Sequence, residues 1–190
     1  MAQIAAEELG VTLNDVKVIS GDTDITPIDL GSYGSRGTIQ AGNAVKAAAA
    51  NAKEQLFAIA AEHLGKPIED LIARNGRIYV KGDESRGASI AEVAQIGLSI
   101  EGKPILGKGH FNPDSDMPDP VTLKGNVSLG WSFVAEVAEV EVDPETGKVT
   151  VTKFTVADDC GFALNPMAVE GQIEGQISQG VGQALLERRV

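Results

Sequence analysis

The stretch "GDTDITPIDLGSYGSRGTIQAGNAV", residues 21–45, decides the fold, because it carries a glycine-rich loop into the start of a helix. Amides at a helix start point outward, and the helix dipole favours negative charge there. The loop's glycines allow the backbone itself to face a ligand. Polar side chains add donors, namely Ser32, Ser35, Arg36 and Thr38. The loop lacks the Walker and Rossmann patterns, so it indicates either an anionic or polar ligand or simply a well-formed turn.

A long helix is predicted to follow this loop. Thr38 is expected to cap it, and apolar residues at three- and four-residue steps continue to about His63, with Gly65 ending the helix. Its first half, residues 44–50, carries almost no side-chain bulk. Such a surface lets another backbone or a flat ligand approach closely, or it reflects high helix propensity alone.

Shorter elements are predicted from apolar spacing and turn residues. They are a helix at 2–9, a strand at 16–20, a hairpin element at 76–82 and a helix at 89–97. Gly10 is expected to end the first helix, and Ser89 to begin the second. The stretch 109–126, which is rich in proline and aspartate, is predicted to be a surface loop.

Residues 131–156 predict a long antiparallel hairpin around "DPETG", with Val142 facing Val149. The apolar alternation changes phase twice, near Val137–Ala138 and near Thr152–Lys153. A one-residue shift turns side chains to the other face, so each position needs a bulge or a change of packing partner. We therefore expect two long strands that serve more than one layer.

The segment "NPMAVEGQIEGQISQGVGQALLE" predicts a helix with two polar or small stripes. One stripe is small: Gly171, Gly175, Ser178 and Gly182. The other is amide: Gln172, Gln176, Gln179 and Gln183. Glycine inside a helix costs about 1 kcal/mol relative to alanine, so a stripe of glycines suggests that something approaches the helix axis closely. Carboxamides both donate and accept, which suits the edge of a heterocycle; the alternative is a helix crossing with the glutamines in water.

Single residues that could carry chemistry favour structural roles. Asp22 and Asp24 fit turn hydrogen bonding better than an acid/base or metal site, because no cluster of histidine or glutamate accompanies them. His63 and His110 are predicted to be surface or capping residues. Cys160 is predicted to be buried and structural rather than nucleophilic.

Composition narrows the function classes. The 190 residues carry a net charge of -11 with no cluster of Lys and Arg, which argues against a nucleic-acid partner. The single cysteine cannot form an internal disulfide or an iron–sulfur site, and it fits a cytoplasmic location. Neither a signal peptide nor an apolar run long enough to span a membrane is encoded.

Three ordered motifs, "GDTDITPIDLGSYGSRGTIQAGNAV", "DDCGFALNP" and "GQIEGQISQGVGQAL", together resemble the molybdenum-cofactor-binding large subunit of the xanthine dehydrogenase and aldehyde oxidase family. The resemblance implies an α+β fold in which mixed sheet elements, a long antiparallel hairpin and packed helices form part of the molybdopterin-binding domain. It divides the chain into a segment with the cofactor loop and long helix (1–65), a variable middle (66–130) and the hairpin with the Gly/Gln-rich helix (131–190). Within the family, "LGSYGSR" is similar to the bacterial branches of 4-hydroxybenzoyl-CoA reductase and carbon monoxide dehydrogenase.

The resemblance also implies cofactor contacts. Molybdenum would be held by a molybdopterin, in bacteria usually the cytosine dinucleotide form. The residues expected to contact the cofactor are Tyr33, Gly34, Ser35, Arg36, Gly37, Gln172 and Gln179. Gly34 is expected nearest the molybdenum, and Gln172 matches the family's pterin-binding glutamine.

Departures from the family pattern are equally informative. The family's catalytic glutamate lies in a "GEP" motif that is absent here, so the base is expected beyond Val190, in an adjacent part of the subunit. The chain is therefore expected to be a fragment that is inactive alone. Its expected partners are the rest of the large subunit, an iron–sulfur subunit, a flavin (FAD) subunit and a small-molecule substrate. The alternatives are a non-catalytic family member with an assembly role and an unrelated anion-binding domain.

Overall fold

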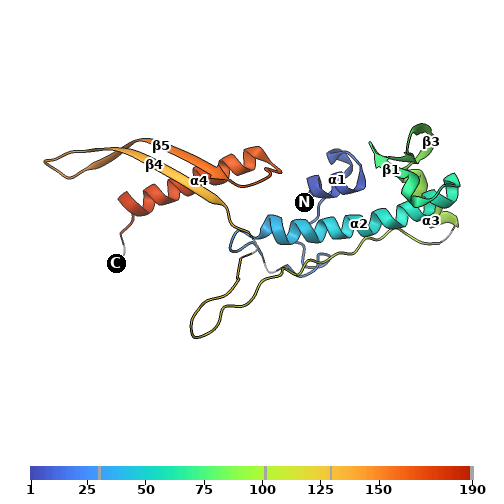
Figure 1. Ribbon diagram of the computed structural model, residues 1–190, viewed down its shortest axis with the longest axis horizontal. Helices are drawn as coiled ribbons and strands as arrows, with labels where there is room; N and C mark the ends of the chain where they lie inside the picture. Colours follow the sequence, from blue (N-terminus) through green and yellow to red (C-terminus); the bar gives the residue numbers. More distant parts are fainter. Residues whose placement is uncertain (30, 101, 129, 189–190) are drawn as a thin grey trace. The chain divides into compact units, whose positions relative to one another are not determined.

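The computed structural model describes residues 1–29, 31–100, 102–128 and 130–188. These residues form two compact units, an N-terminal unit (Met1–Asp116) and a C-terminal unit (Met117–Val190) (Figure 1). Helices and small antiparallel sheets make up both units, which confirms the α+β prediction. In the described part of the chain, no helix has both the length and the apolar character that a membrane crossing needs.

The N-terminal unit contains three helices and one three-stranded antiparallel sheet in its described residues. They are α1 (Ala2–Leu9), α2 (Gly37–Leu64), β1 (Leu71–Arg74), β2 (Arg77–Val80), β3 (Asp83–Ser89) and α3 (Ile90–Ile100), with single 3-10 turns at Leu13–Asp15 and Ile68–Asp70. Gly10 and Gly65 end α1 and α2 in the left-handed conformation, as predicted. The predicted cap Thr38 is wrong: α2 begins at Gly37, and its N-cap, Arg36, makes no side-chain capping hydrogen bond.

The hydrophobic core lies where the second half of α2 meets the sheet and α3. Its buried members are Leu56, Ile59, Ala60, Leu71, Ile78, Val80, Ala88 and Val93. The predicted hairpin element at 76–82 is β2 with its flanking turns, but the sequence prediction missed β1 and β3, which pair with it. Ser89 begins α3 as predicted, and it forms a reciprocal capping box: its amide donates to Glu92 Oε2 at 2.7 Å and its Oγ accepts from the Glu92 amide at 3.1 Å.

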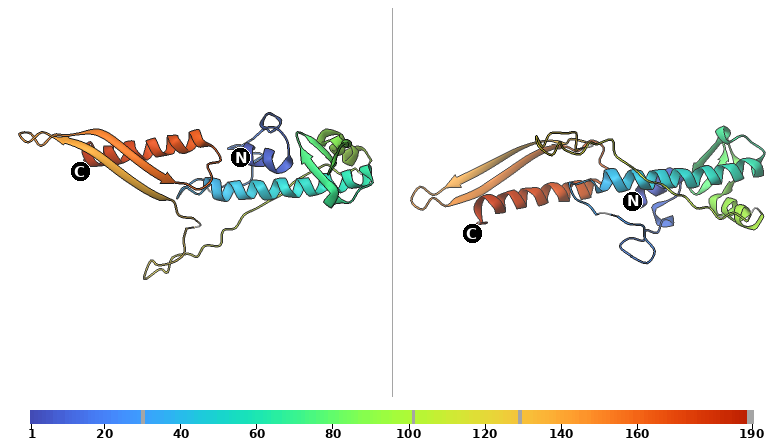
Figure 2. Two further views of the ribbon diagram at one scale, coloured as in Figure 1. Left: turned by 45° about the horizontal axis from the view of Figure 1, so that its top comes forward. Right: turned by 90° about the horizontal axis from the view of Figure 1, so that it is seen from below.

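Another segment of backbone occupies the bulk-free surface of α2. Residues 105–109, the strap, run alongside this helix (Figures 1 and 2). A Cβ atom on Gly107 would lie 2.2 Å from the Ala48 carbonyl oxygen, and one on Gly109 would lie 2.2 Å from the Ala48 amide nitrogen. The small side chains at 44–50 therefore serve the close approach of a backbone, which was one of the two approaches left open by the sequence.

Two side chains of α2 form hydrogen bonds with the backbone of the strap. The Gln55 carboxamide donates to the Leu106 carbonyl at 3.0 Å and accepts from the Leu106 amide at 3.3 Å. The Asn51 Oδ1 accepts from the Lys108 amide at 3.3 Å. Backbone groups of an extended segment need such partners because no strand pairs with them.

The predicted strand at 16–20 is wrong. These residues form no ladder with any described segment, and Val18 and Ile19 are half exposed. Apolar alternation predicts a strand only where a partner strand is present to pair with it. The predicted loop at 109–126 is confirmed, since these residues contain no helix or strand.

The C-terminal unit consists of a hairpin, β4 (Phe133–Val142) and β5 (Val149–Asp159), and the helix α4 (Pro166–Leu185). Val142 pairs with Val149 as predicted. Glu139 pairs with Lys153 and Val140 with Val151, so Thr152 is the extra residue of a bulge, at the predicted place on the second strand. The bulge keeps the half-buried residues of β5 on one face, and these are Val149, Val151, Phe154, Val156 and Asp158.

The phase change on β4 has a different origin. β4 runs without interruption through Val137 and Ala138, so its apolar side chains pass from one face of the hairpin to the other.

The helix α4 packs against β5, and the side-chain carboxamide of Gln176 donates to Glu136 Oε1 at 2.8 Å. Asn165 caps α4 by accepting from the Ala168 amide at 3.1 Å. No described residue of the C-terminal unit is buried.

Candidate functional site

The predicted ligand loop contains a sharp turn at residues 31–37. Gly31, Gly34 and Ser35 have positive φ angles of 87°, 60° and 54°. This backbone suits glycine and is uncommon for serine. The turn is exposed, and the side chain of Tyr33 is 58% accessible. The sequence prediction of a glycine turn before the long helix is therefore confirmed.

Side chains of the turn hold it in shape. The Arg36 guanidinium donates through Nε and Nη2 to the Gly31 carbonyl, at 3.3 Å each, and stacks 3.6 Å above the centre of the Tyr33 ring. The Gly31 amide donates to Asp29 Oδ1 at 2.7 Å. Sequence reasoning missed Asp29, although an aspartate two residues before a glycine is a signal for such a turn. Because Arg36 binds a carbonyl here, its positive charge is not neutralised by these contacts.

The two glycines nearest α2 differ in their surroundings. A Cβ on Gly34 would meet no atom within 4 Å, whereas one on Gly37 would lie 3.0 Å from Ser32 Oγ. Packing within the described residues thus restricts Gly37 and leaves the space around Gly34 open. Among the described residues, only the positive φ angle of Gly34 accounts for a glycine at this position.

On α4, the two glutamines expected to bind the cofactor remain exposed. Neither Gln172 nor Gln179 forms a side-chain hydrogen bond with a described residue, whereas the Gln176 amide is engaged by Glu136. A Cβ on Gly171 or Gly175 would meet nothing within 4 Å. On this surface of α4, exposed carboxamides therefore lie next to glycine positions at which no side chain covers the helix backbone.

The remaining sequence candidates have structural or surface roles. The Asp24 amide donates to Asp22 Oδ1 at 3.0 Å, which confirms the predicted turn. His63 and His110 are exposed, as predicted. The prediction that Cys160 is buried is wrong, because it is exposed in the turn that leaves β5. Among the described residues, no group of three or more His, Cys, Asp or Glu side chains could hold a metal ion.

The carboxyl groups whose pKa is lowered lie in turns and helix caps. Hydrogen bonds from Ser or Thr hydroxyls are the largest cause for Asp15, Asp83 and Asp143. Hydrogen bonds from backbone amides are the largest cause of the lowered pKa of Glu92 and Asp119. Each of these carboxylates stabilises local backbone. None belongs to the turn at 31–37 or to α4.

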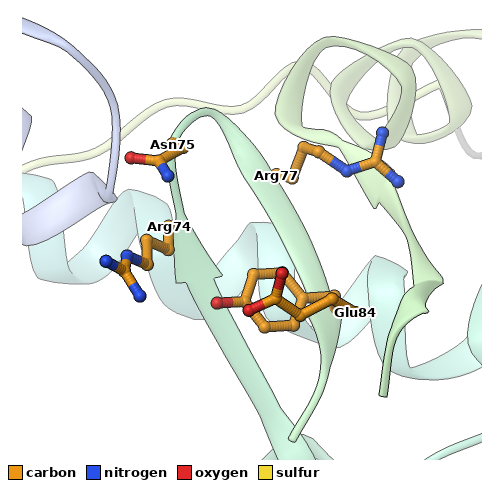
Figure 3. A pocket seen from close by; sticks show the side chains of 5 residues that line it. Arg74, Asn75, Arg77 and Glu84 are labelled. Carbon is orange, nitrogen blue, oxygen red and sulfur yellow. The ribbon is translucent and has the colours of Figure 1, made fainter. Parts of the chain in front are cut away.

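A hollow of about 290 Å³ lies on the three-stranded sheet, and none of the predicted ligand residues lines it (Figure 3). Arg74, Asn75, Arg77, Tyr79 and Glu84 line it. The Arg77 guanidinium donates to the Gly87 carbonyl at 3.2 Å. The lining mixes both signs of charge, so it defines no ligand class.

Comparison with known proteins identifies the kind of domain. The sequence model described as "Molybdopterin cofactor-binding domain" matches residues 1–190. The chain is 34% identical over 187 residues to the carbon monoxide dehydrogenase large chain of Hydrogenophaga pseudoflava, covering 97% of this chain and 22% of that protein. It is also 34% identical over 191 residues to the nicotine 6-hydroxylase large subunit of Paenarthrobacter nicotinovorans, covering 99% of this chain and 22% of that protein.

A solved structure supports the same conclusion. The fold matches the crystal structure of quinoline 2-oxidoreductase from Pseudomonas putida 86 with a TM-score of 0.84 and 31% identity, covering 100% of this chain and 23% of that one. This chain therefore spans about a fifth of the length of the relatives it matches.

Proposed function

Because the chain belongs to the molybdopterin cofactor-binding domain family, we propose that it is part of the catalytic subunit of a molybdenum hydroxylase. The match over all 190 residues carries this proposal. The proposed substrates are aromatic heterocycles, aldehydes or aryl-CoA compounds. The branch of carbon monoxide dehydrogenase and 4-hydroxybenzoyl-CoA reductase stays a prediction, since a nicotine hydroxylase is equally similar at 34% identity.

The predicted residues fit a pterin on chemical grounds. Gln172 and Gln179 carry free carboxamides that can donate to and accept from a pterin edge. Gly171 and Gly175 leave the adjacent helix backbone open. We propose that these two glutamines bind the pterin.

The turn at 31–37 fits a position against the metal centre. Its conformation is fixed by Arg36 and Tyr33, while Gly34 presents no side chain. We propose that Tyr33, Gly34, Ser35, Arg36 and Gly37 contact the cofactor, with Gly34 nearest the molybdenum. When bound, the cofactor, in the proposed cytosine dinucleotide form, supplies the redox chemistry of hydroxylation.

The remaining parts of the enzyme are proposed to come from elsewhere. The catalytic glutamate would lie beyond Val190, and electrons would leave through iron–sulfur and flavin subunits or domains of a cytoplasmic complex. The relatives' names, "large chain" and "large subunit", describe those proteins as parts of assemblies. The chain by itself is expected to have no hydroxylase activity.

The test is to produce residues 1–190 together with the adjacent parts of the subunit and to analyse the purified complex for molybdenum and pterin. Both should be present, and Gly34→Leu should abolish turnover. Gly65→Leu is a matched control, because Gly65 has nearly the same φ angle (59° against 60°) and equally open surroundings. A complex without molybdenum and pterin would support the non-catalytic alternative, and full activity of Gly34→Leu would remove the assignment of the turn.

A further inference from the structure

The face of the hairpin turned away from α4 changes character along its length. By the pairing register, Phe133, Ala135 and Val137 of β4 lie on this far face, opposite Asp159, Ala157 and Thr155 of β5. The face that carries Ala138, Val140 and Val142 also carries the half-buried side chains of β5. On β4 the far face is therefore apolar in the half nearest the start of the strand, Ala157 continues this apolar area on β5, and the Asp159 carboxylate borders it at that end.

Beyond Val137 the far face becomes charged. Glu139 and Glu141 follow on β4, and Lys153 forms an ion pair with Glu139 at 3.3 Å, with both side chains more than half exposed. Exposed ion pairs of this kind are compatible with water on that surface. The boundary between the apolar and charged halves falls between Val137 and Glu139.

The apolar half is uncovered within the C-terminal unit. Phe133 is 74% exposed and Val137 60% exposed. A hollow of about 340 Å³ lies at the same end, and its lining residues are Phe133, Val134, Ala135, Ala157, Asp158 and Asp159. Contiguous exposed apolar side chains with a charged border mark an interaction surface rather than a solvent face.

We propose that the far face from Phe133 to Val137, together with Ala157, is a docking surface for an apolar segment of the same catalytic subunit outside residues 1–190. This inference rests on the proposed function. The relatives are between four and five times longer than this chain, since it covers 22% of each, so the subunit has ample chain to cover the surface. The apolar half is short and bordered by charge, which suits a segment of one chain better than the extended, self-complementary patch of a stable dimer.

Cysteine labelling tests this docking surface. In the complex with the adjacent parts of the subunit, and with Cys160→Ser as background, Val137→Cys and Glu141→Cys are compared for their rate of reaction with a maleimide. Both positions lie on the far face, on opposite sides of the boundary. Val137→Cys should react at least tenfold more slowly than Glu141→Cys, and the two rates should become equal in urea.

Each other labelling result overturns the proposal. Equal native rates mean that the face is open to solvent. Protection of Val137→Cys that weakens on dilution means that a second copy covers it, and equal protection in the chain 1–190 alone means that the cover comes from within the chain. Molybdenum content is measured on the same samples: protection without molybdenum supports docking while refuting the proposed function, and molybdenum without protection does the reverse.

Discussion

The packing of the strap on α2 predicts that a single methyl group at Gly109 is costly. The added Cβ would lie 2.2 Å from the Ala48 amide nitrogen and 2.6 Å from the Ala44 carbonyl oxygen. Ordinary contacts to a Cβ begin at about 3.4 Å, so the strap must move away from the helix by roughly 1 Å. Overpacking of this kind costs about 1–3 kcal/mol.

That movement also lengthens the hydrogen bonds between the strap and α2. The bond from the Lys108 amide to Asn51 and the bond from the Leu106 amide to Gln55 are both 3.3 Å already, near the limit for a hydrogen bond. Each lost bond costs about 1 kcal/mol. If both bonds are lost, we expect Gly109→Ala to destabilise the N-terminal unit by about 3–5 kcal/mol, which lowers its Tm by at least about 10 °C.

Thermal and urea unfolding, followed by circular dichroism, measure this effect. Lys108→Ala is the matched control, because it removes an exposed side chain from the same strap and should change stability by less than about 0.5 kcal/mol. If Gly109→Ala unfolds like the unmodified chain, the strap does not pack on α2 as described. The close approach would then not explain the alanine-rich surface.

Two further predictions concern local structure. Glu92→Gln should weaken the start of α3 at pH 7 but not in acid, because the backbone and hydroxyl hydrogen bonds from Ser89 lower the pKa of Glu92 from its ordinary value. The contribution of Glu92 to stability is therefore present above the unfolded-state pKa and is lost as the pH falls through the folded-state pKa. Urea unfolding at pH 7 and at about pH 3 checks this, and a pH-independent difference would contradict it. Deletion of Thr152 should remove the bulge and join Val151 to Lys153 in a regular ladder, with Phe154 and Val156 still on the face that carries Val149 and Val151. Limited proteolysis should then cleave α4 no faster than in the unmodified chain, and faster cleavage would contradict the assignment of Thr152 as the extra residue.

Local signals in the sequence predicted much of the fold. Gly10, Gly65 and Ser89 mark helix ends through backbone conformation and capping, which depend on near neighbours alone. The bulge at Thr152 was also readable, because a phase change in a strand leaves a visible break in apolar alternation. Such features need no knowledge of distant contacts.

Features that depend on distant partners were not predictable in the same way. β3 reads "DESRGAS", which has no apolar alternation, and it is a strand only because β2 lies beside it. The strap at 105–109 has no regular structure, and its position is determined by its packing against the alanine-rich surface of α2. Conversely, residues 16–20 have the alternation of a strand but no described partner.

The candidate site also has one part that local sequence predicts and another part that it does not. The shape of the turn at 31–37 follows from its own residues, since Arg36, Tyr33 and Asp29 fix it locally. Its assignment to a cofactor came from the order of three motifs, and the match to the cofactor-binding family confirmed the family. The exposure of Cys160 could not be read from "ADDCG", because an apolar strand precedes it on a hairpin that has no buried residue.

Glycines in this chain separate into those that its own packing requires and those that it does not. Gly107 and Gly109 are required, because any side chain would collide with α2. Gly171 and Gly175 lie inside a helix with nothing within 4 Å of a Cβ, so alanine would fit there and would stabilise α4 by about 1 kcal/mol at each position. Contacts within the C-terminal unit supply no reason for that cost. The proposed binding of a pterin beside Gln172 supplies one.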